Sequence, residues 1–329
     1  MAHSAAEERG PGRFAAYAWL VLGYNLLVIL WGAVVRATGS GAGCGEHWPL
    51  CQGRVFPHAQ QIATLIEFAH RATSGIDVLL VAGLVGLAFW RYGRGHAVRR
   101  YATATGFLTL TEGLVGAALV LLGAVGTNVS ASRVAILSVH LVNTFLLIAS
   151  LTLTAWAAGR RVSPVAPAAP GTRSYLVYGA ALLGLVMIGI TGTIAALADV
   201  LFPAPSLAEA LRWDLSGAAA PILRLRIIHP AMAVAAGGYL LAVAGLARHM
   251  AGPAVRKLAG WLIGLVVFQF CLGAVNMLLL APVPLQVLHL LAADLVWITL
   301  VLLSAEALRG GAEAVASPLS PSPAPVPSA

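Results

Sequence analysis

The segment LIEFAHRATSG, residues 65–75, places a glutamate, a histidine and an arginine near the start of a long apolar run. An ionisable side chain is costly in the hydrocarbon core of a membrane unless it faces a cavity, a partner or a cofactor. Glu67, His70 and Arg71 are therefore the first candidates for a functional site. The surrounding sequence indicates what these three side chains face.

The composition of the whole chain is that of an integral membrane protein. Of the 329 residues, 59% are hydrophobic and 10% are charged, which is more apolar surface than a soluble fold of this size can bury. The net charge of +8 does not indicate nucleic-acid binding, because the basic residues form short clusters between apolar segments, as topology signals do. We therefore expect a lipid bilayer, and no nucleic acid, as a partner.

Eight apolar runs are long enough to cross a hydrocarbon core of about 30 Å, which takes about 20 helical residues. They fall near residues 16–37, 62–90, 101–123, 131–156, 175–198, 222–247, 258–280 and 284–308. The Pro/Ala-rich connection 160–173 predicts a cytoplasmic linker between two four-helix halves, 16–159 and 174–309. Residues 1–15 are predicted to form an N-terminal tail, and the low-complexity tail 310–329 is expected to be disordered.

The distribution of lysine and arginine predicts the orientation in the membrane. Most basic residues lie on the inner side if the N-terminus is cytoplasmic, so both termini are predicted to be cytoplasmic. The first dozen residues are polar and contain two glutamates, unlike an acid-poor, Arg-rich organelle transit peptide. A bacterial inner membrane is the simplest location.

The two halves resemble each other in the order and spacing of their residues, which predicts a tandem duplication. The aligned pairs include His70 with His229, Glu112 with Gln269 and His140 with His289. Because each repeat has an even number of spans, the copies run parallel and are related by an axis along the membrane normal. The expected fold is an all-α integral membrane protein of eight transmembrane helices, built as two tandem, parallel-repeat four-helix bundles.

The four aligned histidines are predicted to lie in one layer, about 9 to 14 Å below the outer surface at about 1.5 Å per helical residue. One such histidine alone is better explained by a hydrogen bond between helices. Four at equal depth favour two axial pairs for haem iron, His70 with His140 and His229 with His289. Zinc is less favoured, because each histidine pair offers only two nitrogen ligands.

Arginines near the outer helix ends are candidates to pair with the propionates of such a haem. These candidates are Arg36, Arg71, Arg224 and Arg226. The alternative is that they extend to lipid headgroups. Arg71 and Arg226 are the preferred pair.

Only the first half carries a carboxylate beside its histidine. Glu67 precedes His70 by three residues on the same helical face, whereas Arg226 stands at the matching position before His229. Glu67 could exchange protons at the first site, or it could merely pair with Arg71 at the i,i+4 spacing. The contrast predicts one working site and one supporting site.

The longer outer loops carry two further signals. Cys44 and Cys51 follow the first span, and on the oxidising side of a membrane they predict a disulfide. In the corresponding loop of the second half, FPAPSLAEALRWDL, residues 202–215, predicts a short amphipathic surface helix. Cys271, inside the seventh span, is expected to be a small core residue.

The stretch WGAVVRATGSGAGCGEHWPLCQG, residues 31–53, the segment IEFAHR, residues 66–71, and the four histidines on even-numbered spans closely resemble the heme A synthase family. The resemblance covers nearly all of the chain outside the two tails. It implies oxidation of the C8 methyl group of heme O to the formyl group of heme A through successive hydroxylations. The implied partners are a heme O synthase, a membrane or soluble electron donor, and a terminal oxidase that accepts the product.

The resemblance also implies roles for individual residues. His229 and His289 would hold a b-type haem for electron transfer, and His70 and His140 would hold the substrate haem. Glu67 matches the glutamate of the family that is important for function, and proton transfer is the role that we expect for it.

The chain departs from the family pattern in its first outer loop. Members commonly have Pro-Asp where this chain has Glu46 and His47, and the second cysteine pair of some members is absent.

Two other functions stay open. A di-haem electron carrier linked to quinol would need neither Glu67 nor the cysteine loop, and a transporter would use the intramembrane carboxylates and bind no haem. Those carboxylates are Glu67, Asp77, Glu112 and Asp294.

Overall fold

The computed structural model describes residues 11–58, 61–160, 171–216, 220–250 and 252–315. Within these ranges the regular secondary structure is helical, and eight helices are long and apolar enough to cross a membrane. The predicted class, an all-α multi-pass membrane protein, is confirmed. The predicted linker falls largely outside the described residues.

The spanning helices begin and end within a few residues of the predicted runs. The first four are α1 (Pro11–Ala37), α2 (Ile62–Arg91), α3 (Ala97–Leu121) and α4 (Ala131–Ala158). The others are α5 (Thr172–Leu201), a span made of α7 (Pro221–Arg226) and α8 (Ile228–Met250), α9 (Pro253–Leu278) and α10 (Val283–Val315). The short elements η1 (Ser40–Ala42) and α6 (Leu207–Leu215) lie in loops, and α6 confirms the predicted surface helix.

Two differences from the predicted spans have a physical reason. The sixth span is interrupted at Ile227, because the ring of Pro230 clashes with the carbonyl four residues earlier and proline has no N–H to donate. In addition, α10 continues to Val315, into the segment that was predicted to be disordered. The sequence AEAV at this end is rich in strong helix formers, which favours continuation of the helix.

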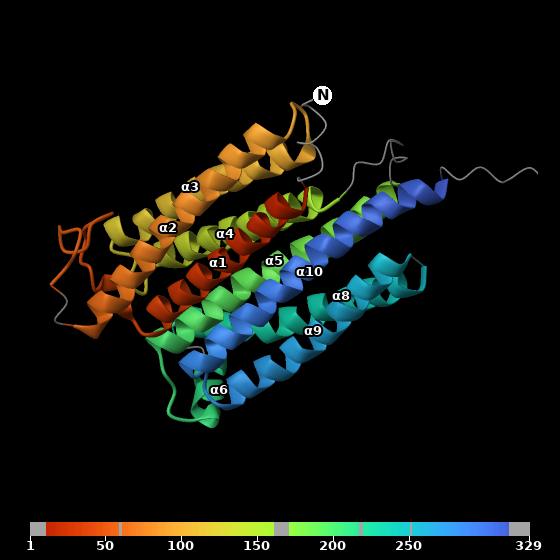
Figure 1. Ribbon diagram of the computed structural model, residues 1–329. Coiled ribbons are helices and arrows are strands. Elements are labelled where there is room, and N and C mark those ends of the chain that lie inside the picture. Colours follow the sequence, from red (N-terminus) through yellow and green to blue (C-terminus); the bar gives the residue numbers. More distant parts are fainter. Residues whose placement is uncertain (1–10, 59–60, 161–170, 217–219, 251, 316–329) are drawn as a thin grey trace, which may run out of the picture.

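The helices lie side by side along a common direction, with α1 to α4 in one group and α5, α8, α9 and α10 in the other (Figure 1). The two groups meet where α4 packs on α5 and α10, and where α1 packs on α10. At this junction Phe145 and Trp297 stack with 4.8 Å between ring centroids, and Trp297 Nε1 donates to the carbonyl of Phe145 at 2.7 Å. The junction is therefore part of the packed core.

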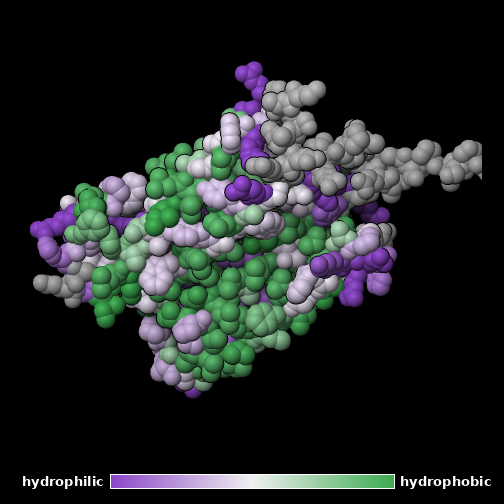
Figure 2. All heavy atoms as spheres, viewed as in Figure 1, coloured by the Kyte–Doolittle hydropathy of each residue, from purple (hydrophilic) through white to green (hydrophobic). Residues whose placement is uncertain are grey.

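The outer surface matches a bilayer. Figure 2 shows hydrophobic side chains over the middle of the visible face and hydrophilic side chains toward both ends. Large apolar side chains are exposed on all eight spans, including Leu20, Leu79, Leu114, Leu146, Leu176, Val234, Trp261 and Leu288. Such a surface is unfavourable in water but favourable against lipid.

Helices α1 and α2 are joined by a regular series of hydrogen bonds, which we call the α1–α2 seam. Three side chains of α1, spaced seven residues apart, each donate to a backbone carbonyl of α2. These bonds are Tyr17 to Leu80 (2.9 Å), Tyr24 to Thr73 (3.2 Å) and Trp31 to Ile66 (3.0 Å). Because seven residues are close to two helical turns, the three donors share one face of α1. The seam fixes the register of α2 and therefore the position of Glu67 and His70.

Candidate functional site

The predicted histidine pairs lie on facing helices, toward the end of the bundle where α1 ends and α2 begins, which we call the loop end. In the second half, the rings of His229 and His289 are 6.4 Å apart between centroids, with an angle of 87° between their planes. Two imidazoles on opposite sides of one metal ion would have centroids about 6 Å apart, since each metal–nitrogen bond is about 2 Å and each nitrogen lies about 1 Å from its ring centre. At this separation the two rings would be able to hold one haem iron between them.

In the first half, His70 and His140 are close enough to interact electrostatically. The Nδ1 atom of His70 is buried and has no hydrogen-bond partner, and the same holds for Nδ1 of His289. Buried ring nitrogens without partners are uncommon in folded proteins. The two halves thus share imidazoles that a bound ligand would satisfy.

Glycines on neighbouring helices allow close approach to three of the histidine rings. An added Cβ would lie 2.9–3.1 Å from a ring carbon at Gly32 beside His70, Gly192 beside His229 and Gly273 beside His289. Any larger residue would push the ring aside, because real Cβ contacts are rarely this short. These glycines therefore set the orientation of the imidazoles.

A polar side chain from α3 or α9 meets the histidine on the last helix of each half. Glu112 Oε1 lies 3.4 Å from His140 Nδ1, and Gln269 Nε2 lies 3.3 Å from His289 Nε2. Glu112 is also bound by Asn143, at 2.5 Å, and by the hydroxyl of Thr144. The sequence analysis missed these two residues, although they stand three and four residues after His140 and thus share its helical face.

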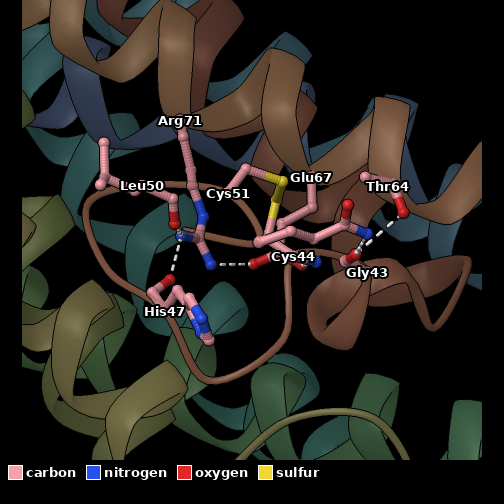
Figure 3. Close-up of a disulfide and its surroundings, with 9 residues drawn as sticks. Gly43, Cys44, His47, Leu50, Cys51, Thr64, Glu67 and Arg71 are labelled. Atoms are coloured by element: carbon pink, nitrogen blue, oxygen red, sulfur yellow. Dashed lines mark hydrogen bonds and ion pairs between the residues drawn. A yellow bond between two sulfur atoms is a disulfide. The ribbon is translucent and has the colours of Figure 1, made fainter. Parts of the chain in front are cut away.

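Glu67 is held by the first outer loop as well as by Arg71 (Figure 3). Its Oε2 accepts the backbone N–H of Cys44 at 2.7 Å, and its Oε1 accepts from Arg71 Nη2 at 2.5 Å. Glu67 is only 3% exposed. The i,i+4 ion pair that was the alternative to a functional role is present, and a loop contact that the sequence did not predict accompanies it.

The disulfide between Cys44 and Cys51 is present and closes this loop. Arg71 Nη1 donates to the carbonyls of His47, at 2.5 Å, and Leu50, at 2.7 Å, which both lie inside the disulfide-closed segment 44–51. Figure 3 shows the guanidinium of Arg71 directed into this loop, with the disulfide beside Glu67. The loop and the Glu67–Arg71 pair therefore form one hydrogen-bonded unit.

The loop also packs directly on the first turn of α2. Thr64 Oγ1 donates to the carbonyl of Gly43 at 2.8 Å. A Cβ added to Gly43 would lie 2.5 Å from the carbonyl group of Ala63, which is backbone and has little freedom to move.

We expect Gly43→Ala to destabilise the protein by about 1–3 kcal/mol, the usual cost of forcing extra atoms into a packed position. The measurement is the thermal unfolding midpoint of the detergent-solubilised chain. Gly41→Ala is the matched control, because its Cβ would meet Val125 at an ordinary 3.5 Å. Equal midpoints for the two variants would show that the approach of the loop to α2 is not tight.

Arg71 and Arg226, the preferred propionate candidates, are bound to groups of the protein itself. Arg71 is bound as described, and Arg226 donates to Asp214 at 2.6 Å and to Asp199 at 2.8 Å. Arg224 is exposed, whereas Nε of Arg36 is buried without a hydrogen-bond partner. Arg133, which the sequence analysis missed, is 5% exposed, interacts electrostatically with Arg36 and also has an unpartnered Nε.

The prediction for Cys271 was wrong, because this residue is exposed on α9. In a membrane-spanning helix, the side chains that face lipid are as apolar as those that face the core. The sequence pattern of such a helix therefore does not distinguish its two faces.

Comparisons with known proteins complete the description of the chain. The sequence model of the family described as cytochrome oxidase assembly protein, COX15-CtaA, matches residues 15–301. A Thermus thermophilus protein named protoheme IX farnesyltransferase is 45% identical over 306 residues, which are 92% of this chain and 50% of that protein.

Two proteins named heme A synthase match shorter parts. That of Alkalihalophilus pseudofirmus is 35% identical over 160 residues, 46% of this chain and 50% of that protein. That of Shouchella clausii is 42% identical over 99 residues, 30% of this chain and 33% of that protein. The chain thus spans about half the length, or less, of these relatives.

Proposed function

The chain belongs to the cytochrome oxidase assembly protein family, and from this membership we propose that it is a heme A synthase, which oxidises the C8 methyl group of heme O to a formyl group. The relatives named heme A synthase support this substrate and product. One observation carries the proposal. The buried carboxylate of Glu67 is fixed by the disulfide-closed loop, three residues from His70, and the matching position of the second half holds Arg226.

The four histidines divide into two sites in this proposal. His229 and His289 hold a b-type haem, which supplies electrons one at a time when bound, and their 6.4 Å centroid separation supports this assignment. His70 and His140 hold and orient the substrate haem. The unpartnered Nδ1 of His70 and the electrostatic contact between the two rings support it.

Within the first site, the residues of the chain position the substrate and move protons. Glu67 exchanges a proton at its carboxylate. Arg71 and the N–H of Cys44 fix that carboxylate, and segment 44–51 limits the access of water. Glu112, held by Asn143 and Thr144, fixes the ring of His140.

Haem propionates are best placed beside Arg36 and Arg133. Both guanidinium groups have a buried Nε without a partner, and arginine pairs readily with carboxylates. Arg133 donates to the carbonyls of Gly126 and Asn128 but has no carboxylate partner, whereas Arg71 and Arg226 are each paired with carboxylates of the protein. The proposed propionate site therefore lies between α1 and α4.

Matching contacts support the proposed duplication. Gly32 faces His70 as Gly192 faces His229, and Glu112 meets His140 as Gln269 meets His289. A second contact is also repeated, but with the roles of the two helices exchanged. Tyr17 of α1 donates to the carbonyl of Leu80, whereas Tyr239 of α8 donates to the carbonyl of Val177 in α5.

The proposed partners follow from the substrate and product. A protoheme IX farnesyltransferase, the heme O synthase, supplies the substrate, and the matched Thermus protein bearing that name supports this pathway link. A membrane or soluble donor provides electrons, and a terminal oxidase accepts heme A. We place the protein in a bacterial cytoplasmic membrane with both termini inside and the haem sites near the outer face, where a disulfide persists.

Co-expression with a source of heme O, followed by mass analysis of the extracted haems, tests the function. We expect heme A to appear. Recovery of unchanged heme O from folded protein that contains haem b, with a competent electron donor present, would contradict the proposal and favour the di-haem electron carrier. Absence of any bound haem would favour the transporter.

A further inference from the structure

A buried polar pair, Asn25 and Asp77, lies in the α1–α2 seam. Asn25 Nδ2 donates to Asp77 Oδ2 at 2.8 Å, and the two residues are 3% and 4% exposed. Oδ1 of each residue is buried and has no hydrogen-bond partner. Buried acceptors without a partner are costly. A proton on Asp77 Oδ1 would turn that oxygen from an acceptor into a donor.

The surroundings of Asp77 offer no counter-charge. Its carboxyl group is buried and accepts a hydrogen bond from Asn25, and no ion pair joins it to a cationic side chain of the described residues of α1 or α3. The ionisable group that faces it from α1 is the phenol of Tyr24. A bare carboxylate with one hydrogen bond is very unfavourable at this depth of a membrane.

Hydroxyl groups occupy the seam between Asp77 and His70. Thr73 and Ser74 lie one helical turn from each of these two residues, because both separations are three or four residues. Their hydroxyls donate to main-chain carbonyls one turn earlier: Thr73 to Ala69 at 2.8 Å and to His70 at 3.0 Å, and Ser74 to His70 at 2.7 Å. A hydroxyl that donates one hydrogen bond can still accept another, so it can pass a proton on.

These residues form a group of polar side chains along the α1–α2 seam, which we call the polar column. Its members are Tyr24, Asn25, Thr73, Ser74 and Asp77. The column lies on the side of His70 away from the loop end, and Asp77 is seven residues from His70, or about 10 Å along the helix. Glu67 lies on the other side of His70, toward the loop.

The second half has no polar column at the aligned positions. The residues there are Gly184, Leu185, Met232, Ala233 and Ala236. Helices α5 and α8 still meet at this level, because a Cβ added to Gly184 would lie 3.3 Å from the Cβ of Ala236. Polar groups in the middle of a membrane are costly and usually serve a function. At these aligned positions, only the half that carries Glu67 has polar side chains.

The proposed reaction moves protons whichever oxidant it uses. With dioxygen and an external electron donor, R–CH3 + 2 O2 + 4 H+ + 4 e− gives R–CHO + 3 H2O. With water as the oxygen source and an external electron acceptor, R–CH3 + H2O gives R–CHO + 4 H+ + 4 e−. Protons must therefore enter or leave a buried site in either case.

We propose that Asp77 is a proton-exchange residue of the first half, held by Asn25, and that the hydroxyls of Thr73 and Ser74, one helical turn from both Asp77 and His70, carry the proton between Asp77 and the first site. Asp77 takes up and releases the proton at Oδ1. It does not touch the substrate, so it acts as a relay rather than as a catalytic residue. The proposal rests on the proposed function, which it extends by a second path for protons.

Two variants test the relay by activity. Asp77→Asn keeps the shape of the side chain but cannot carry the proton. The double variant Asn25→Leu, Asp77→Ala introduces the residues that the second half has at these positions, at a level where α5 and α8 meet through Gly184 and Ala236. We expect heme A formation to slow about tenfold or more in both, since acid–base groups contribute about 10²–10⁴-fold when they act directly. The haem b content and thermal midpoint should stay unchanged.

Asp294→Asn is the matched control. Asp294 is another buried intramembrane carboxyl, 0% exposed on α10 and outside the polar column, and its variant should keep the activity of the unmodified chain. A rate for Asp77→Asn equal to that of the unmodified chain would overturn the relay. The relay would also be overturned if Asp77→Asn were slow and the double variant fully active. The slow rate of Asp77→Asn would then come from the buried, unpaired amide of the new asparagine.

Infrared spectroscopy provides a readout that does not depend on turnover. In haem-free protein, the difference spectrum between the unmodified chain and Asp77→Asn should contain a carboxylic-acid band that shifts in D2O. Absence of that band would overturn the proposal. Failure of the unmodified chain to form heme A would instead contradict the proposed function, and the infrared result would still decide whether Asp77 carries an exchangeable proton.

Discussion

Glu67→Gln lowers the rate of heme A formation by about 10²–10⁴-fold, the usual contribution of a group that transfers protons directly. Glutamine has nearly the same size as glutamate and keeps an oxygen that can accept the N–H of Cys44. It cannot take up a proton, and it cannot form the ion pair with Arg71. We therefore expect the chemical step to fail while the loop stays folded.

The measurement combines mass analysis of the extracted haems with the haem b absorbance of the purified protein. The haem b content should be that of the unmodified chain, since Glu67 lies in the other half. Glu209→Gln serves as the control, because Glu209 lies on the surface helix α6 and pairs with the exposed Arg212. Full activity of Glu67→Gln would remove Glu67 from the mechanism.

We expect replacement of either His229 or His289 by alanine to remove haem b from the protein almost completely. Each ring would supply one protein ligand to the iron in the proposed site, so a single substitution would leave only one. The glycines that hold the rings offer no substitute, because they have no side chain. Heme A formation should be lost together with the cofactor.

Haem b is quantified by its absorbance after purification. His249→Ala is a suitable control, because His249 is exposed near the end of α8. His70→Ala and His140→Ala should keep haem b and lose the binding of heme O. An equal loss of haem b in the His70 and His289 variants would show that the two sites are not assigned correctly.

The fold was largely predictable because its main determinants are local. Each span is an apolar run of sufficient length, and the length of such a run depends on nothing else in the chain. The disulfide and α6 were predictable for the same reason. Each needs only two nearby cysteines or one amphipathic segment.

The partners of the polar side chains were harder to predict. The guanidinium of Arg71 binds carbonyls that lie 21 and 24 residues away in the sequence, and any backbone carbonyl offers the same chemistry. Arg226 binds two aspartates, of which Asp199 belongs to α5 and Asp214 to α6. A charged residue near a helix end therefore indicates that a polar partner exists, but not which residue it is.

The α1–α2 seam was missed for a related reason. Tyr17, Tyr24 and Trp31 read as ordinary aromatic residues of an apolar helix, although their seven-residue spacing was present in the sequence. Their acceptors are backbone carbonyls, which leave no trace in the sequence of α2. The pair Asn25 and Asp77 required knowledge of which faces of the two helices meet.

The contacts of Arg71 with the disulfide-closed loop bear on how this loop can evolve. The guanidinium recognises main-chain oxygens of residues 47 and 50, and Glu67 recognises the main-chain N–H of residue 44. Main-chain groups are common to nearly all amino acids. Side chains inside the loop can therefore change with little penalty as long as the backbone path is kept. Glu46 and His47 can thus stand in place of Pro-Asp while the main-chain contacts of Glu67 and Arg71 are retained.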